Sequence, residues 1–385
     1  MATLTQQIKR FALDQGYCRV GIAPADDFED HIQELLSRGS LYDFYIEGPS
    51  KPLLGARPKV AWPAAKSIVV LAYDYVQCAF PATLIGKVAR VYQSRSMNAQ
   101  RHRIAGLRLQ AVKEFIRSKG INIGPSMMLP ERRLGMRAGI SNIGRNNFAF
   151  VDGIGSFINL SAIVVDRVLE YDAPAPPICK CPRGCTACMD ACPTRAIYAP
   201  FRLDPRRCIN FNTSMTKEEI GFGVTDNIPP EIRKHMAQAI FGCDICQEVC
   251  PRNAKRLKME LPKDPLLEVI SKSFSLVSVL HMKEDYFEEY VQPMTYNFGL
   301  EPRYLQRNAA VALGNSHDPM YLDDLGVELE HDDPMIRGHV AWAIGQIGTH
   351  KGIALLEARL ARESDHGVRL EISQALESIA SKPAD

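Results

Sequence analysis

The 385-residue sequence contains no long apolar run. Its longest one, Ile68 to Tyr73, is far shorter than the roughly 20 residues that a helix needs to cross a bilayer, so we expect no membrane span. The first residues show neither the apolar core of a secretory signal nor a pair of arginines. These absences favour the cytoplasm, where cysteine thiols stay reduced.

A nucleotide-binding motif is also missing. No Gly-x-Gly-x-x-Gly follows an expected strand, and the short Gly153-Ile-Gly155-Ser156 is typical of a turn. We therefore expect no nicotinamide site. Electrons for any redox chemistry would come from another protein, such as a ferredoxin or a flavodoxin.

What the chain does have is 11 cysteines, most of them in two matching runs. The runs are Cys185-x-x-Cys188-x-x-x-Cys192-Pro and Cys243-x-x-Cys246-x-x-x-Cys250-Pro. In two-cluster ferredoxins each such run gives three thiolates to one [4Fe-4S] cluster and its last cysteine to the other. Zinc sites also use paired Cys-x-x-Cys, but they give no reason for x-x-x-Cys-Pro after both pairs. Disulfides would need an oxidising compartment.

The first run departs from the ferredoxin pattern at its first ligand. Position 182, where that cysteine is expected, is Pro182, and Cys181 comes one residue early. We assign cluster one to Cys181, Cys185, Cys188 and Cys250, and cluster two to Cys192, Cys208, Cys243 and Cys246. Cys179 remains an alternative to Cys181.

Residues 1–172 mix two kinds of periodicity, which indicates an α+β domain. Helices are expected at 4–15, 27–37 and 105–118, strands at 19–22, 67–75, 148–151 and 162–165, and a loop at the Gly- and Pro-rich 48–63. Residues 86–125 hold nine basic side chains and one acid. They form either a solvated helix face or a surface that meets phosphate, as in RNA.

A proline-rich stretch at 172–178 is predicted to link this domain to the cluster domain, residues 173–258. Residues 259–385 contain a repeat: the motif that starts at Arg307 recurs at Arg337 and, more weakly, at Arg369. Small residues at helical spacing are the signature of HEAT-type helical repeats. So few repeats cannot make a long solenoid, so we expect them to pack on the cluster domain.

Together these parts resemble the epoxyqueuosine reductase family. The resemblance rests on the cysteine motifs, on the repeat motif at Arg307, and on the segment from Arg137 to Asn146 that continues at Gly155. It implies a nitroreductase-like N-terminal domain that binds cobalamin, to which the two clusters pass electrons. The reduced corrinoid then removes oxygen from an epoxide on a tRNA base. The corrinoid would lie at Arg137, Gly139, Gly144, Arg145, Asn146, Gly155 and Ser156.

The chain departs from the family at positions that are expected to lie near the substrate. The family's acid, six positions before Glu131, is Pro125 here, and residues 121–130 contain no acid at all. Three further family positions are altered, at Asn142, Arg145 and Asn98-Ala99-Gln100. Opening an epoxide needs a general acid, and the candidates are Glu131, Asp152, Tyr75 and Tyr92.

The departures leave the substrate open. We expect slow or no turnover of epoxyqueuosine tRNA, or a different substrate. The alternatives are an electron-transfer protein that reduces a partner's corrinoid or metal centre, and an interaction protein in which the clusters only stabilise the fold.

Overall fold

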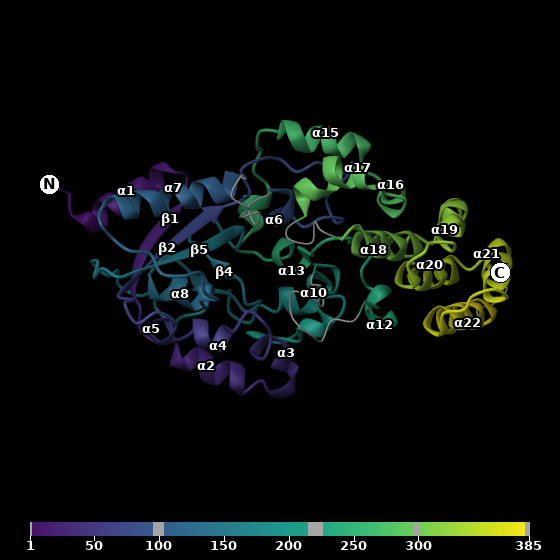
Figure 1. Ribbon diagram of the computed structural model, residues 1–385, viewed down its shortest axis with the longest axis horizontal. Coiled ribbons are helices and arrows are strands. Elements are labelled where there is room, and N and C mark those ends of the chain that lie inside the picture. Colours follow the sequence, from purple (N-terminus) through teal and green to yellow (C-terminus); the bar gives the residue numbers. More distant parts are fainter. Residues whose placement is uncertain (1, 95–103, 215–225, 296–300, 382–385) are drawn as a thin grey trace.

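The structure is a computed structural model that describes residues 2–94, 104–214, 226–295 and 301–381. The molecule is elongated, with the α+β half at one end, the helical repeats at the other and the cysteine-rich segment between them (Figure 1). Among the helices of these residues, none combines the length and the apolar character needed to cross a membrane.

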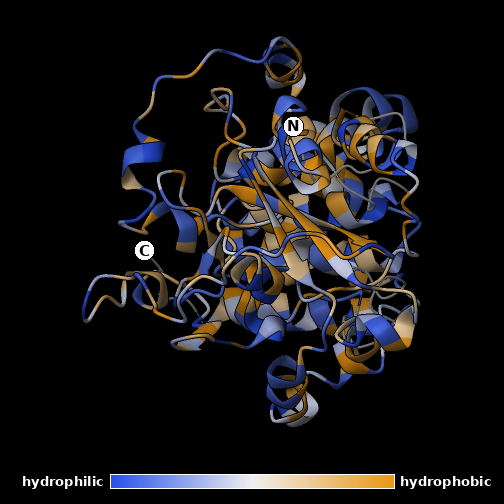
Figure 2. Ribbon diagram, turned by 90° about the vertical axis from the view of Figure 1, so that its left-hand side faces the viewer, coloured by the Kyte–Doolittle hydropathy of each residue, from blue (hydrophilic) through white to orange (hydrophobic). Residues whose placement is uncertain are grey.

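The α+β half is built on a three-stranded antiparallel sheet with β2 (Ser67–Asp74) between β1 (Arg19–Pro24) and β5 (Ile158–Val165). The apolar β2 is buried on both faces. Val69 packs in a cluster with residues of α1 (Leu4–Asp14) and α7 (Ile104–Ser118), whereas Ile68 packs with residues of α2 (Glu29–Leu36) and α8 (Glu131–Arg137). Figure 2 shows these strands as a hydrophobic layer inside the fold. Such double burial explains why the sequence of β2 is apolar at successive positions rather than alternating.

Most predicted elements of this half are present, with ends shifted by a few residues. The predicted strand at 148–151 is only β4 (Ala149–Phe150), paired with β3 (Asn142–Ile143), and the one at 162–165 is the second half of β5. The predicted loop at 48–63 is wrong, because it contains two short helices, α4 (Pro52–Gly55) and α5 (Pro58–Ala61). Each begins with a proline, which is tolerated in the first turn because the N–H it lacks has no partner inside the helix there. The half also contains α3 (Asp43–Ile46) and α6 (Arg90–Gln93).

The proline-rich stretch after β5 is fixed to the α+β half. The Asp172 carboxylate accepts hydrogen bonds from the Ile22 N–H at 2.7 Å and from Lys9 at 2.6 Å. The Ala175 N–H donates to the Met136 carbonyl at 2.8 Å. The link therefore belongs to the fold at its start, and the boundary between residues 172 and 173 stays a prediction.

The cysteine-rich segment consists of short elements joined by turns. They are α9 (Ala187–Asp190), β6 (Ile197–Ala199), β7 (Arg202–Leu203), α10 (Ile209–Ser214), α12 (Pro230–Arg233), α13 (Ile245–Glu248) and α14 (Ala254–Leu257). The C-terminal part is helical, with α15 (Pro265–Ser273), α16 (Leu276–Leu280), α17 (Glu284–Tyr286), α18 (Pro302–Gly314), α19 (Leu322–Glu328), α20 (Pro334–Ile347), α21 (His350–Leu360) and α22 (His366–Ala380).

Small residues set the spacing of the repeats. A Cβ on Gly314 of α18 would stand 2.7 Å from the Ala343 Cα of α20, and one on Gly345 would stand 2.7 Å from the Ala375 Cβ of α22. Real Cβ atoms do not approach so closely, so the helices stack at this distance only with glycine. The repeat motif therefore encodes the contact between neighbouring repeats.

The repeats pack on the cysteine-rich segment, as predicted. Arg307 of α18 is buried and donates to the carbonyls of Asn212 at 3.0 Å and Asp226 at 2.9 Å. Asn308 donates to the Thr213 carbonyl at 3.0 Å. The shared core also contains residues 84–92 of the N-terminal half, so the three predicted domains are not independent packing units.

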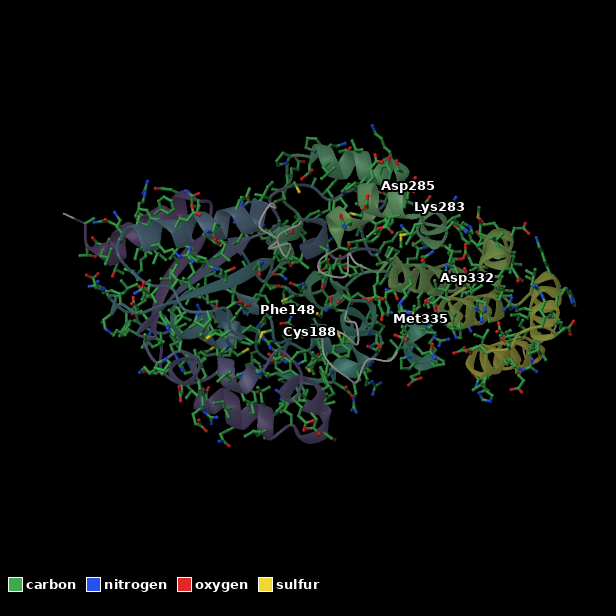
Figure 3. All side chains as sticks on the ribbon, viewed as in Figure 1. Phe148, Cys188, Lys283, Asp285, Asp332 and Met335 are labelled. Atoms are coloured by element: carbon green, nitrogen blue, oxygen red, sulfur yellow. The ribbon has the colours of Figure 1, made fainter. Side chains whose placement is uncertain are left out.

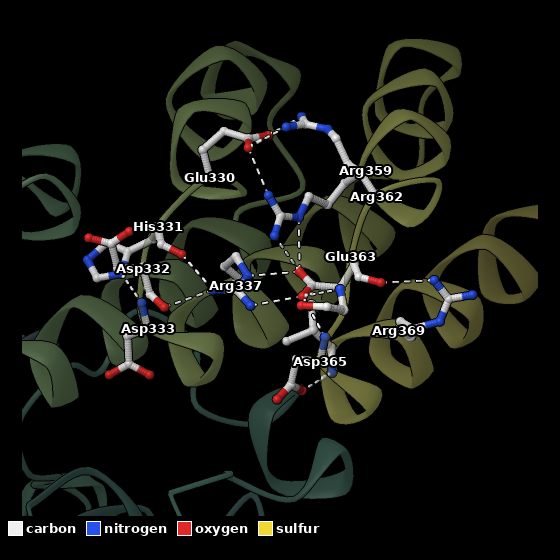
Figure 4. Close-up of polar contacts among 12 residues, drawn as sticks. Glu330, His331, Asp332, Asp333, Arg337, Arg359, Arg362, Glu363, Asp365 and Arg369 are labelled. Atoms are coloured by element: carbon white, nitrogen blue, oxygen red, sulfur yellow. Dashed lines mark hydrogen bonds and ion pairs between the residues drawn. The ribbon is translucent and has the colours of Figure 1, made fainter.

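A buried ion-pair network joins the last two repeats (Figure 4). Glu363, whose side chain is fully buried, accepts hydrogen bonds from Arg337 at 2.8 Å and from Arg359 at 2.7 Å. Burial alone would raise the Glu363 pKa, but these hydrogen bonds and one from the Asp365 N–H lower it to about 2.

Replacing Glu363 by glutamine is expected to destabilise the repeats by about 3–5 kcal/mol, because it leaves the buried Arg337 without its counter-charge. Since the folded pKa lies below the unfolded one, the stabilisation is present above about pH 4.5 and is lost as the pH falls toward 2. Chemical denaturation of both proteins at pH 7 measures the difference. Glu330→Gln, at a half-exposed pair with Arg362, should cost under about 1 kcal/mol. Equal effects of the two substitutions would contradict this account.

Candidate functional site

All eleven cysteines are free thiols in the structure, and eight of them gather in two sets. One cavity near the middle of the molecule is lined by Cys181, Cys185, Cys188 and Cys250, together with Arg145 and Asn146. Figure 3 marks Cys188 at this place, between the sheet and the repeats. Short helices keep the spacing compact: α9 carries Cys188, and α13 ends just before Cys250.

The other four cysteines form the second set. Burial raises the pKa of Cys246 well above its usual value, and the thiols of Cys208 and Cys243 raise it further. Burial also raises the pKa of Cys208, with a further contribution from Cys192. Each of these four thiols is therefore within electrostatic range of at least two of the others.

Both sets have the chemistry that an iron–sulfur cluster requires. Burial and the neighbouring thiols of Cys250, Cys181 and Cys185 raise the pKa of Cys188 to about 11. Without a cation, four such thiolates would repel one another in a poorly solvated place. Iron provides the compensating charge, and all-sulfur donor sets are typical of these clusters.

The structure separates the two candidates for the first ligand. Cys181 lines the first cavity and affects the pKa of both Cys188 and Cys250. Cys179 does neither. This favours Cys181, although the full ligand assignment stays a prediction.

The segment predicted to meet the corrinoid lies directly against both cysteine sets. Its middle part forms the β3–β4 hairpin, in which Arg145 donates to the Cys185 carbonyl and Asn146 donates to the Cys246 carbonyl at 3.2 Å. Ser156 binds the same region, since its N–H donates to Asn253 at 2.9 Å. A cofactor held by this segment would be next to the clusters.

The predicted glycines also make close contacts within the protein. A Cβ on Gly155, whose φ is +95°, would stand 2.3 Å from Asn253 Oδ1, and one on Gly139 would stand 2.3 Å from the Ala173 carbonyl. A Cβ on Gly144 would stand 2.4 Å from the Phe150 ring. These glycines are therefore required for the packing of the site, and their contact with a corrinoid stays a prediction.

Arg137 also makes its contacts within the protein. Its guanidinium donates to the carbonyls of Asp26 and, at 2.9 Å, Asp27, and it lies 3.4 Å from the Phe28 ring centroid. The contact of Arg137 with a corrinoid also stays a prediction.

Two buried polar atoms beside the hairpin lack a hydrogen-bond partner within the described part of the chain: Ser141 Oγ and Arg252 Nη1. The other nitrogen of Arg252 donates to Asn142 at 2.9 Å, and its guanidinium lies over the Phe150 ring. Buried polar groups are normally satisfied. Arg252 therefore has a donor to offer to the carbonyl of a corrin amide, whereas Ser141 Oγ lies against Gly135 of α8. At Arg252 the residues present fit such a cofactor.

Among the candidate proton donors, Glu131 has the most suitable carboxyl. Its side chain is exposed at the start of α8, yet the surrounding protein desolvates it and raises its pKa to about 7, against a small opposing effect of Arg132. A carboxyl with this pKa is protonated in a large fraction of molecules at neutral pH, which is what a general acid needs.

The other three candidates are poorer donors. Asp152 accepts a hydrogen bond from Lys180 at 2.5 Å, which lowers its pKa and keeps it ionised. Tyr75 is buried, and burial raises its pKa well above its usual value. Tyr92 packs against Phe241 and donates to Asn210 at 3.4 Å. Pro125 is exposed, and Asn98-Ala99-Gln100 lies outside the described residues.

The sequence interpretation missed Ser141, Arg252 and Asn253 as parts of the site. Arg252 and Asn253 directly follow the Cys250-Pro251 pair. That position next to a predicted ligand was the available signal.

Comparison with known proteins agrees with this geometry. Residues 180–253 match the 4Fe-4S double cluster binding domain, and residues 299–377 match HEAT repeats. The epoxyqueuosine reductase of Bacillus subtilis (strain 168) is 32% identical over 389 residues, which cover 97% of this chain and 95% of that protein. The chain belongs to the epoxyqueuosine reductase family.

Solved structures of the family superimpose over nearly the whole chain. A crystal structure of epoxyqueuosine reductase with an epoxyqueuosine-modified tRNA-Tyr stem loop has a TM-score of 0.83 at 28% identity and covers 98% of this chain and 99% of its own. A structure of the B. subtilis enzyme, with a catalytic aspartate loop swung out of the active site, has a TM-score of 0.82 at 29% identity, covering 97% of this chain and 98% of its own.

Family membership confirms several predictions. The protein is an oxidoreductase of α+β and HEAT-repeat architecture, and it holds two [4Fe-4S] clusters.

Proposed function

We propose that this epoxyqueuosine reductase relative binds cobalamin at the β3–β4 hairpin and reduces the epoxide of epoxyqueuosine in tRNA, with Glu131 as the proton donor. The observation that carries the proposal is the match to epoxyqueuosine reductases over nearly the whole chain, one of them solved with an epoxyqueuosine-modified tRNA stem loop. Glu131 is the candidate donor because desolvation raises the pKa of its carboxyl to about 7. The family's acid is Pro125 here, and Glu131 offers a protonated carboxyl six residues away in sequence.

The residues of the chain have separate roles in this proposal. The hairpin would hold the corrinoid, with Arg252 beside it as a hydrogen-bond donor, while Arg145 and Asn146 fasten the hairpin to both cluster loops. The clusters and the corrinoid, when bound and reduced, supply the electrons for the reaction. Removal of the epoxide oxygen takes two electrons and two protons, breaks both C–O bonds and releases the oxygen as water. Glu131 gives one proton to the oxygen as the first C–O bond breaks, and water supplies the second proton when the other C–O bond breaks.

The partners follow from the same chemistry. The tRNA is the substrate, as in the stem-loop complex of the related enzyme. The electrons come from a separate one-electron donor such as a ferredoxin or flavodoxin. Eleven free thiols suit a reducing compartment, and we infer the cytoplasm.

Reduced, cobalamin-loaded protein is expected to convert epoxyqueuosine to queuosine in tRNA, measured by mass spectrometry of the digested nucleosides. We expect a lower rate than that of a relative that carries the family's acid at the position of Pro125. Protein that binds cobalamin and both clusters but forms no queuosine would reject this substrate and favour a different one.

The second candidate is an electron-transfer protein, favoured by the absence of an acid at Pro125. It predicts that the clusters reduce a partner's corrinoid, with no turnover of tRNA by the purified chain. Turnover without a further protein, using a chemical reductant, distinguishes the two.

A further inference from the structure

A second cavity, of about 360 Å³, opens where the N-terminal half meets the β6–β7 hairpin. Its charged and aromatic lining comprises Arg38, Arg195, Tyr198, Asp204, Arg206 and Arg207. Arg38 comes just after the end of α2, whereas the others lie between one and 13 residues before Cys208. The volume lies in the range of pockets that hold small ligands or single groups of larger ones.

The cavity has an excess of positive charge. Its one carboxylate, Asp204, is paired with Arg206 at 3.2 Å. Arg195 and Arg207 donate to the backbone carbonyls of Met189 and Thr194, and neither forms an ion pair within the described parts of the chain. The guanidinium charges are therefore left for an anion from outside.

Arg38 gives a second, independent indication of a ligand. Its side chain is only 6% exposed, and its Nη2 donates to Glu34 at 2.5 Å and to the Phe201 carbonyl at 3.1 Å. Its Nη1 is buried and has no hydrogen-bond partner among the residues that the structure describes. An unsatisfied buried guanidinium nitrogen is costly, and an oxyanion in the cavity is the group that would satisfy it.

The cavity is connected to the predicted corrinoid segment by one residue. The Phe201 N–H donates to the Arg145 carbonyl at 2.8 Å, and the Phe201 carbonyl accepts from Arg38. Tyr198, 56% exposed, adds an aromatic ring at the rim, of the kind on which nucleobases stack.

We propose that this arginine pocket binds a phosphodiester group. Guanidinium groups bind phosphate oxygens in bidentate fashion, and four of them line one cavity here. The inference rests on the proposed function, which offers two sources of the group: the backbone of the tRNA, and the nucleotide loop of cobalamin.

The test uses Arg195→Ala/Arg206→Ala in the full-length, cluster-loaded protein. Affinity for an unmodified anticodon stem loop is measured by fluorescence anisotropy without corrinoid over a range of salt. Affinities for cobalamin and for cobinamide, which lacks the phosphodiester, are measured by absorption spectroscopy. We expect affinity for one source to fall about tenfold to a hundredfold. An RNA phosphate would also lower the salt slope by about one for each lost contact.

The outcomes identify the source. Weaker stem-loop binding assigns the pocket to RNA, and weaker binding of cobalamin but not of cobinamide assigns it to the corrinoid loop. Unchanged affinity for all three ligands overturns the proposal. Arg10→Ala, which removes a 79% exposed arginine of α1, is the matched control and should change nothing.

Two further measurements keep the result clear. Iron content and melting temperature check that the double variant folds; if it does not, Arg206→Ala alone carries the test, since that side chain is 57% exposed. The stem loop lacks the epoxide, so the binding measurement tests the pocket independently of the reaction. Failure of the proposed function appears instead as absent turnover by the wild-type protein with its binding intact.

Discussion

Replacing Glu131 by glutamine is expected to lower the turnover of epoxyqueuosine tRNA at pH 7 by roughly 10²–10⁴-fold, the usual contribution of a general acid. This corresponds to about 3–5 kcal/mol of barrier. Glutamine keeps the shape of the side chain but has no acidic proton. Single-turnover measurements with reduced, cobalamin-loaded protein give the rate of this step.

The pH dependence gives a second readout. A general acid must be protonated, so the wild-type rate should fall as the pH rises through about 7, where the Glu131 carboxyl ionises. The Glu131→Gln protein should lack this step. Asp152→Asn is the matched control, because Lys180 already holds Asp152 ionised and the loss should be small. A full rate with Glu131→Gln would mean that another group delivers the proton.

Loss of one cluster is the second large effect. Anaerobically reconstituted protein is expected to hold about eight iron and eight sulfide per chain. Cys188→Ala and Cys246→Ala should each retain only one cluster, roughly half of the iron, and both should abolish turnover because the path of the electrons is interrupted. Iron and sulfide analysis, with electron paramagnetic resonance of the reduced protein, measures this.

The first ligand is tested by a closely matched pair. Cys181→Ala should lose the cluster that Cys188→Ala loses, whereas Cys179→Ala should keep both, because Cys181 lines the cavity with Cys188 and Cys250. The reverse result would mean that Cys179, and not Cys181, is the first ligand. Tightly bound zinc without iron after reconstitution would contradict the assignment of both sites.

Local patterns predicted much of this protein. The apolar run of β2, the helical spacing of α1 and α7, and the repeated motif at Arg307 give elements that the structure contains. The two cysteine runs predicted the two clusters that family membership supports. Such features are readable because the period of a helix or strand, and the spacing of ligands around a cluster, are properties of short stretches of chain.

Other features depended on contacts between distant stretches. The helices at 52–61 were hidden because glycine and proline favour loops on average, while proline in a first helical turn is also tolerated. The resemblance placed the glycines at 139, 144 and 155 at the corrinoid, but only the structure identified the protein atoms that approach them.

The sequence by itself determined the cluster chemistry, the repeat architecture and the absence of an acid at Pro125. Tertiary structure alone decided which of the four candidates has a pKa near neutral pH, because the pKa of Glu131 depends on desolvation by segments that surround it in space. It also created the arginine pocket, whose residues lie more than 150 positions apart at Arg38 and Arg195. Charge and solvation act through space, so no local pattern in the chain records them.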